Sequence, residues 1–183
     1  VGGQWINCNA TLAVIQNYTI NQHPADPNRM MGGTQDNGSA GTTDGSLGWP
    51  QITTGDGGFG AYDPSTLTRL YTTYVYLKVY RVSGSVTSDI TGPWTGDSRE
   101  WIAPIVLDPN SATRLYAGSN RLWVNVAAST SATWTAISTS SVADGGTVTA
   151  IEPVAGRPGV VWVGNSAGGV WRTLDGGTNW ARM

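Results

Sequence analysis

The chain has 183 residues, only 12% of them charged, and a formal net charge of −2. It is long enough for one compact domain with a core, and the lack of a basic patch argues against nucleic acid as a partner. No apolar run reaches the roughly 18 residues of a membrane helix, so we expect no membrane insertion. Glycine is abundant, and nine Trp and seven Tyr accompany a single Phe, which indicates an all-β domain with many turns.

The start of the chain, VGGQWIN, has the form of a turn followed by a tryptophan-bearing strand. We therefore expect residues 1–7 to form an outer strand. Cys8 is the only cysteine, so an internal disulfide is excluded.

A repeated pattern runs through the rest of the chain. An Asp-Pro or Arg-Pro step is followed by an apolar strand and a glycine or polar turn. The copies begin at residues 26, 63, 108 and 157. Their spacing of roughly 40 to 48 residues is the length of one four-stranded propeller blade. The sequence predicts a single β-propeller domain of about four four-stranded blades, at 8–52, 53–98, 99–141 and 142–183.

The first candidates for chemistry lie in glycine-rich loops. Asp36 follows GGTQ, and Asp56 lies in TGDGG. Two carboxylates facing each other across a cleft act as general acid and base on a glycosidic bond, so the pair is a candidate catalytic site. The alternative is that both carboxylates cap turns by accepting backbone N–H groups. A third interpretation is a calcium site built from Asp36, Asn37 and Asp44, although the spacing fits no established calcium loop.

Aromatic residues in loops suggest a different function. Trp49 and Trp94, with Asn37 and Asp97 nearby in the sequence, are candidate ligand contacts, because exposed rings stack on sugar faces and polar side chains bind hydroxyls. The alternative for Trp94 is that it fills the gap between two blades. The recurring arginines 29, 69 and 114 are interpreted as structural, pairing with carboxylates of neighbouring turns.

The most specific motif is the last one. Residues 173–180 read TLDGGTNW and match the pattern S/T-x-D-x-G-x-x-W/F at every fixed position. The glycines supply positive φ angles and the Asp bonds back to the turn amides. We therefore assign Thr173, Asp175, Gly177 and Trp180 a structural role. Trp134 occupies the corresponding position in the preceding repeat.

With this motif the chain resembles the Asp-box, or bacterial neuraminidase repeat, propeller superfamily, which includes sialidases, xyloglucan-hydrolysing endoglucanases, sortilin-type receptors and a photosystem assembly factor. The GGTQDNG segment at 32–38 is similar to segments of secreted glycosyl-hydrolase-like repeat proteins. The resemblance implies a β-propeller. Sialidase activity is disfavoured, because no Arg-Ile-Pro motif is present.

The resulting functional prediction is recognition of a glycan or a protein by a secreted or cell-surface propeller module. A glycoside hydrolase using Asp36 and Asp56 is the first alternative, and a structural or assembly repeat is the second. No cofactor is expected beyond the calcium alternative. The repeats fit a piece of a larger propeller, a four-bladed ring, or half of an eight-bladed homodimer.

Overall fold

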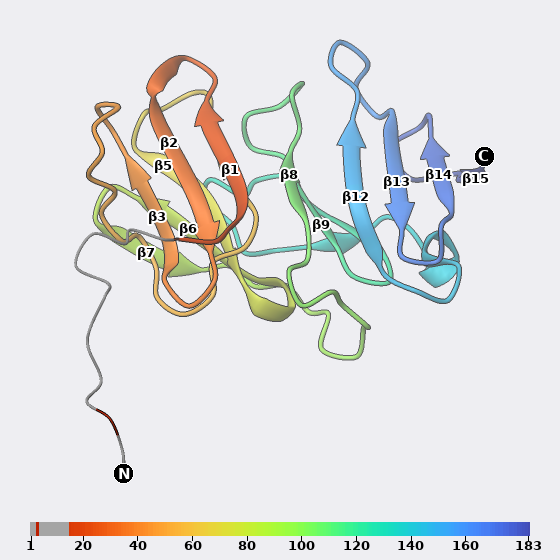
Figure 1. Ribbon diagram of the computed structural model, residues 1–183. Helices are drawn as coiled ribbons and strands as arrows, with labels where there is room; N and C mark the ends of the chain where they lie inside the picture. Colours follow the sequence, from red (N-terminus) through yellow and green to blue (C-terminus); the bar gives the residue numbers. More distant parts are fainter. Residues whose placement is uncertain (1–2, 4–14) are drawn as a thin grey trace.

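The computed structural model describes Gly3 and residues 15–183 (Figure 1). Cys8 and almost all of the expected outer strand at 1–7 lie outside this part of the chain. The described residues form four small antiparallel sheets and two short 3-10 helices. The prediction of an all-β propeller with four blades is confirmed.

Each sheet is one blade, with its strands in chain order from the centre outward. Blade 1 contains β1 (Asn17–His23), β2 (Asp26–Thr34) and β3 (Gly38–Thr42); blade 2 contains β4 (Gly60–Tyr62), β5 (Arg69–Tyr74), β6 (Lys78–Ser83) and β7 (Val86–Asp89). Blade 3 contains β8 (Ile105–Leu107), β9 (Leu115–Gly118), β10 (Leu122–Asn125) and β11 (Thr135–Ala136); blade 4 contains β12 (Val148–Pro153), β13 (Val161–Asn165), β14 (Val170–Thr173) and β15 (Ala181–Arg182). The helix η1 (Val75–Leu77) joins β5 to β6, and η2 (Ser140–Ala143) precedes β12.

Blade 1 differs from the expected four-stranded form. Its sheet has three strands, and a single antiparallel bridge between Ala40 and Gln51 stands where the fourth strand would pair. Proline has no backbone N–H, so Pro50 can only accept a hydrogen bond, and it does so from the amide of Gly41 at 3.1 Å. The fourth strand of this blade is therefore reduced to isolated contacts.

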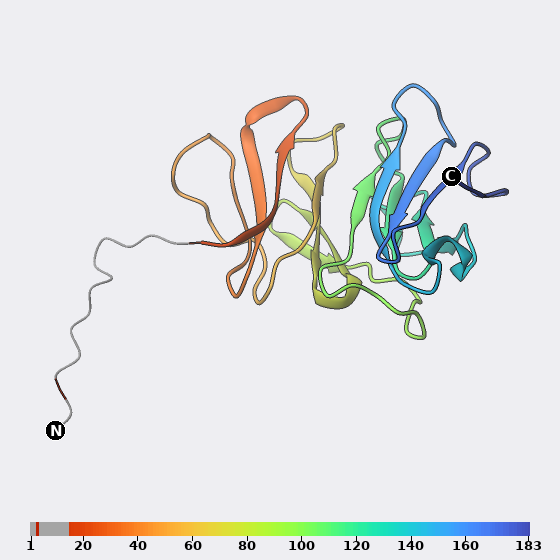
Figure 2. The same ribbon diagram turned by 45° about the vertical axis from the view of Figure 1, so that its right-hand side comes forward.

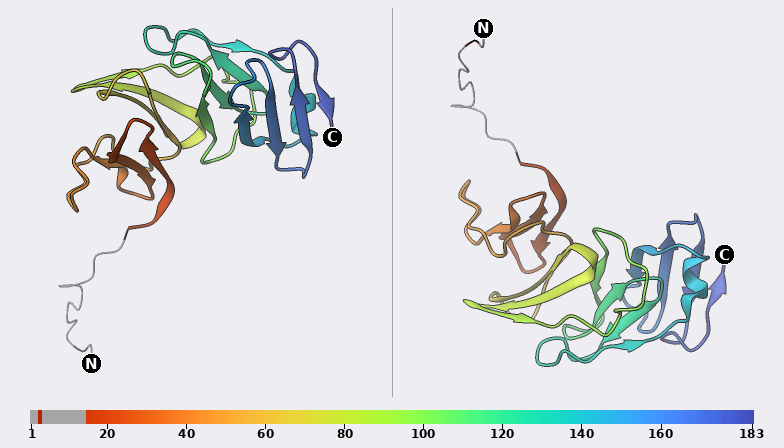
Figure 3. Two further views of the ribbon diagram at one scale, coloured as in Figure 1. Left: turned by 90° about the horizontal axis from the view of Figure 1, so that it is seen from above. Right: turned by 90° about the horizontal axis from the view of Figure 1, so that it is seen from below.

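The blades stand side by side, with blade 1 and blade 4 at the two ends of a curved row (Figures 1 and 2). The innermost strands contact each other in chain order, β1 against β4, β4 against β8 and β8 against β12. Seen along the axis, the sheets follow one another around a common centre (Figure 3). One hydrophobic cluster fills the space between blades 2 and 3, and a second fills the space between blades 3 and 4.

Tryptophan rings fill the outer parts of these two spaces. The indole N–H of Trp134 donates to the carbonyl of Ile90 at 2.7 Å, and that of Trp180 donates to the carbonyl of Ile137 at 2.8 Å. Each ring thus links its own blade to the end of the preceding blade. The burial of these large rings, together with a satisfied N–H, stabilises the contact between blades.

The recurring arginines pair with turn carboxylates, as the sequence predicted. Arg69 lies 2.8 Å from Asp63 and Arg114 lies 3.4 Å from Asp108, and both carboxylates are buried. Arg29 makes the corresponding pair with Asp26 at 3.1 Å near the surface. These arginines therefore fix the chain reversal at the start of the second strand in blades 1, 2 and 3. Within the described residues, no helix is long and apolar enough to span a membrane.

Candidate functional site

The sequence-predicted carboxylates lie on one end of the propeller. We call this end the loop face; it carries the segments that lead into each inner strand and the turns that join second to third strands. Antiparallel pairing brings these segments together, because the start of an inner strand lies beside the end of the second strand. In blade 2, for example, Gly60 at the start of β4 pairs with Thr72 near the end of β5. Asp36 lies in the turn between β2 and β3, and Asp56 lies just before β4.

The structure brings Asp36 and Asp56 together, through the backbone of one and the side chain of the other. The amide of Asp36 donates to Oδ1 of Asp56 at 3.0 Å. Asp36 has a φ of 59°, which places it in the left-handed region, and its side chain is exposed. Asp56 therefore caps the turn that presents Asp36. The carboxylate of Asp36 accepts no hydrogen bond from the described residues and faces solvent.

Aromatic side chains also lie on the loop face. Tyr18 at the start of β1 packs edge-on against Trp101, with ring centroids 5.6 Å apart. Burial raises the pKa of Tyr18, and the negative charges of Asp56 and then Asp36 raise it further. Trp101 is 41% exposed. Its carbonyl accepts the amide of Tyr76 at 2.9 Å, and Tyr76 is 56% exposed.

Unusual backbone conformations also gather on the loop face. Four non-glycine residues in the described part of the chain have positive φ, and all lie in segments of this face: Asp36, Tyr76, Leu77 and Asp144. Such conformations cost roughly 1 kcal/mol or more each and persist only where the surroundings fix them. One of them, Tyr76, combines this conformation with an exposed aromatic side chain.

Two of the predicted ligand contacts are instead structural. Trp94 is buried, donates its indole N–H to the carbonyl of Leu77 at 3.1 Å, and packs edge-on against Trp123 and Trp134. It fills the gap between blades 2 and 3 and has no free face for a sugar. Asp97 accepts hydrogen bonds from Ser119 at 2.6 Å and from Trp123 at 3.0 Å, and its other oxygen lies 3.2 Å from Arg121. The prediction that these two residues contact a ligand is therefore corrected.

The residues of the calcium alternative do not converge. Asp36 and Asn37 precede β3, whereas Asp44 follows the end of β3. A strand of this length separates them by roughly 13 Å, because each residue rises about 3.3 Å. Among the described residues, no group of three or more His, Cys, Asp or Glu side chains is placed to hold a metal ion.

Asn37, which was also predicted to contact a ligand, donates to the carbonyl of Gln35 at 3.0 Å and is exposed on the loop face.

Asp44 and Trp49 belong to a motif that the sequence interpretation missed. Residues 42–49 read TTDGSLGW and match the pattern of residues 173–180 except for serine at the glycine position. Thr42 donates to Asp44 at 2.9 Å, just as Thr173 donates to Asp175 at 2.9 Å. The hydrogen bonds, with the Ser46 amide foremost, hold the pKa of Asp44 below its ordinary value. A search that tolerated one mismatch would have found this copy.

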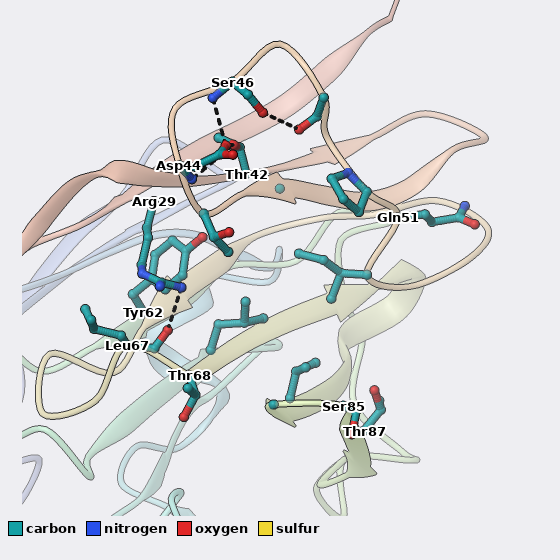
Figure 4. Close-up of a pocket in the computed structure, with 18 residues that line it drawn as sticks. Arg29, Thr42, Asp44, Ser46, Gln51, Tyr62, Leu67, Thr68, Ser85 and Thr87 are labelled. Atoms are coloured by element: carbon teal, nitrogen blue, oxygen red, sulfur yellow. Dashed lines mark hydrogen bonds between the residues drawn. The ribbon is translucent and has the colours of Figure 1, made fainter.

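A groove opens between blades 1 and 2 beside the end of β3, where Gly41 and Thr42 line it (Figure 4). Its volume is about 540 Å³. Apolar side chains of both blades form its floor, and threonine and serine hydroxyls surround it. Of the residues singled out in the sequence, only Arg29 and Asp44 line it, and sequence periodicity alone gave no indication of the groove.

Comparison with known proteins shows the fold. No protein-family model matches the chain, and no curated protein matches it. Its structure is similar to an ancestral GH74 enzyme (TM-score 0.69, 14% identity, 92% of this chain and 24% of that one) and to the GH74 xyloglucanase of Xanthomonas campestris (0.63, 15%, 91% and 30%). It is also similar to YCF48 from Cyanidioschyzon merolae (0.59, 17%, 86% and 56%). The chain therefore spans less than a third of the two enzymes, and at these identities the likeness extends to the propeller fold alone.

Proposed function

We propose that the chain is a carbohydrate-recognition module that binds a neutral polysaccharide on the loop face. The observation that carries this proposal is the exposed ring of Trp101, packed edge-on against Tyr18, on the same face as the Asp36–Asp56 pair. Flat rings bind the apolar faces of sugars, and carboxylate oxygens accept hydrogen bonds from their hydroxyls.

The GH74 neighbours, though not YCF48, support a sugar as the ligand. One of them is a GH74 xyloglucanase, a propeller enzyme that acts on a neutral glucan. The net charge of −2 and the carboxylates on the loop face disfavour an acidic polysaccharide. Neutral glucans of this kind lie outside cells, which agrees with the proposed secreted or cell-surface location.

The test measures binding of xyloglucan and of an acidic pectin by affinity electrophoresis and calorimetry. We expect retention of xyloglucan alone, weakened about fivefold or more by Trp101→Ala and by Tyr76→Ala, because each change removes a stacking surface. Leu47→Ala is the matched control, since Leu47 is fully exposed beyond the end of β3, away from the loop face. Equal retention by all four proteins would remove the loop face from the binding site.

Hydrolysis is the second candidate, favoured by the proximity of Asp36 to Asp56. Release of reducing ends from xyloglucan is the measurement. Cleavage that is lost in Asp36→Asn but kept in Asp175→Asn would establish the enzyme, because Asp175 only closes a turn on blade 4. Binding without turnover would favour recognition alone.

A further inference from the structure

The groove between blades 1 and 2 lies at a position that tryptophan occupies elsewhere. Trp134 directly precedes β11 and Trp180 directly precedes β15. Each indole N–H donates to the isoleucine that follows the outer strand of the preceding blade, Ile90 and Ile137 respectively. Two of the three contacts between consecutive blades are thus closed in the same way.

The carbonyl that would complete the third such contact belongs to Ile52. The amide of Ile90 bonds to the third strand of its blade at Val79, and that of Ile137 bonds at Leu122, both at 2.9 Å. The amide of Ile52 makes the corresponding bond to Ser39 of β3 at 2.6 Å. Ile52 lines the groove, and no hydrogen bond to its carbonyl is present among the described residues.

In blade 2 the position equivalent to Trp134 and Trp180 is held by Thr87, which has no ring. The third strands align as VYRV (79–82), LWVN (122–125) and VWRT (170–173), so Val82 corresponds to Asn125 and Thr173. Continuing the strand register by one residue places Trp134 opposite Asn125 and Trp180 opposite Thr173. In blade 2 the partner of Val82 is Thr87. A threonine therefore stands where the next two blades carry tryptophan.

The lining of the groove fits an uncharged aromatic ring. Leu70, Val82 and Thr87 lie in one row across β5, β6 and β7, and they face Ile52 across the groove. The charged groups nearby are already neutralised or bonded. Arg29 pairs with Asp26 at 3.1 Å, and a carboxylate oxygen of Asp44 accepts the Ser46 amide at 3.0 Å. Figure 4 shows Arg29, Thr42, Ser85 and Thr87 around the open space.

We infer that this groove, called here the indole slot, binds the tryptophan side chain of a partner polypeptide, with the indole N–H donating to the carbonyl of Ile52. A polypeptide is the fitting source because β7, which carries Thr87, is the outermost strand of blade 2. Its free backbone edge can pair with an extended segment that places one side chain in the slot. The inference does not depend on carbohydrate binding at the loop face.

The test uses N-acetyl-tryptophanamide and a pentapeptide with tryptophan at its centre, observed by ligand-detected NMR because the chain has nine tryptophans of its own. We expect a dissociation constant on the order of 1 mM for the amide and at least fivefold tighter binding for the peptide. Thr87→Trp should fill the slot, abolish binding of both probes and raise the urea midpoint. Val86→Trp is the matched control, since neighbouring side chains of a strand point to opposite faces.

Three outcomes would overturn the inference. The first is that neither probe binds the natural chain, and the second is that the probes bind Thr87→Trp as well as they bind Val86→Trp. The third is that the peptide binds no more tightly than the amide, which would make the groove a site for a small indole. Ser85→Trp, at the exposed rim of the slot, provides a second block if Thr87→Trp does not fold. Undiminished binding to that variant would also contradict the site.

Discussion

Two buried tyrosines occupy equivalent positions in neighbouring repeats but differ in whether the hydroxyl has a hydrogen-bond partner. Tyr71 on β5 and Tyr116 on β9 follow the same Arg-Leu pair and are both buried. Burial, followed by the negative charge of the nearby Asp63 or Asp108, raises each pKa to about 12. The hydroxyl of Tyr116 donates to Asp108 at 3.2 Å, whereas that of Tyr71 has no partner among the described residues.

The two tyrosines should therefore respond differently to loss of the hydroxyl. Tyr116→Phe is expected to lower the free energy of unfolding by about 1–2 kcal/mol, because it leaves the buried carboxylate of Asp108 short of a donor. Tyr71→Phe should be neutral or stabilising, since it removes an unpaired polar group. Urea unfolding of the two variants measures the difference. Equal losses would show that Tyr71 has an unrecognised partner.

The turn formed by residues 173–180 is the element that closes blade 4. In blade 4, the hydroxyl of Thr173 donates to Asp175 at 2.9 Å and accepts the amide of Gly177 at 2.9 Å. Asp175 also accepts from the amide of Asn179 at 2.9 Å, and its hydrogen bonds to Asn179 hold its pKa below the ordinary value. The turn thereby directs Trp180 toward blade 3.

Thr173→Val tests this element without changing its volume. The variant should lose about 1–2 kcal/mol of unfolding free energy, because the amide of Gly177 is left without its acceptor inside a tight turn. Thr149→Val is the control, since Thr149 is exposed on β12 of the same blade and away from the turn. Urea midpoints give the comparison. A loss no larger than that of the control would mean that the turn is held by Asp175 alone.

At the scale of the whole molecule, the outer sides of blades 1 and 4 carry apolar groups. Ile20 on β1 is 62% exposed, and because the neighbouring Thr19 donates to the Gly58 carbonyl beside β4, strand alternation turns Ile20 away from blade 2. Trp162 on β13 is half-buried beneath Arg172, at 5.1 Å from the ring centroid, on the side of blade 4 away from blade 3. Among the described residues, the extensive contacts join consecutive blades and do not join blade 4 to blade 1.

We therefore expect two copies to associate through these sides and complete a larger ring. Light scattering should give a mass about twice the 19.2 kDa of the chain, independent of concentration. Ile20→Asp should return the mass to that of one chain, whereas Leu47→Asp, at a fully exposed loop position, should not. A single-chain mass at every concentration would show that the four blades are sufficient alone.

The sequence by itself determined the features that repeat along one strand or one turn. The period gave the propeller and its four blades, and the recurring arginines predicted their pairing with turn carboxylates, because each of these patterns involves residues close together in the chain. The intact motif at 173–180 specified its own turn for the same reason. The related copy at 42–49 escaped because Ser46 replaces one glycine.

Only the tertiary structure decided how the blades fill the spaces between them. Trp94 and Trp49 are both tryptophans beside glycine or proline in the sequence, yet Trp94 is buried among residues up to 40 positions away. The contact of Asp36 with Asp56 and the empty place opposite Ile52 likewise depend on how one blade rests on the next. Strand patterns record which face of a strand is apolar, but not which distant residue covers it.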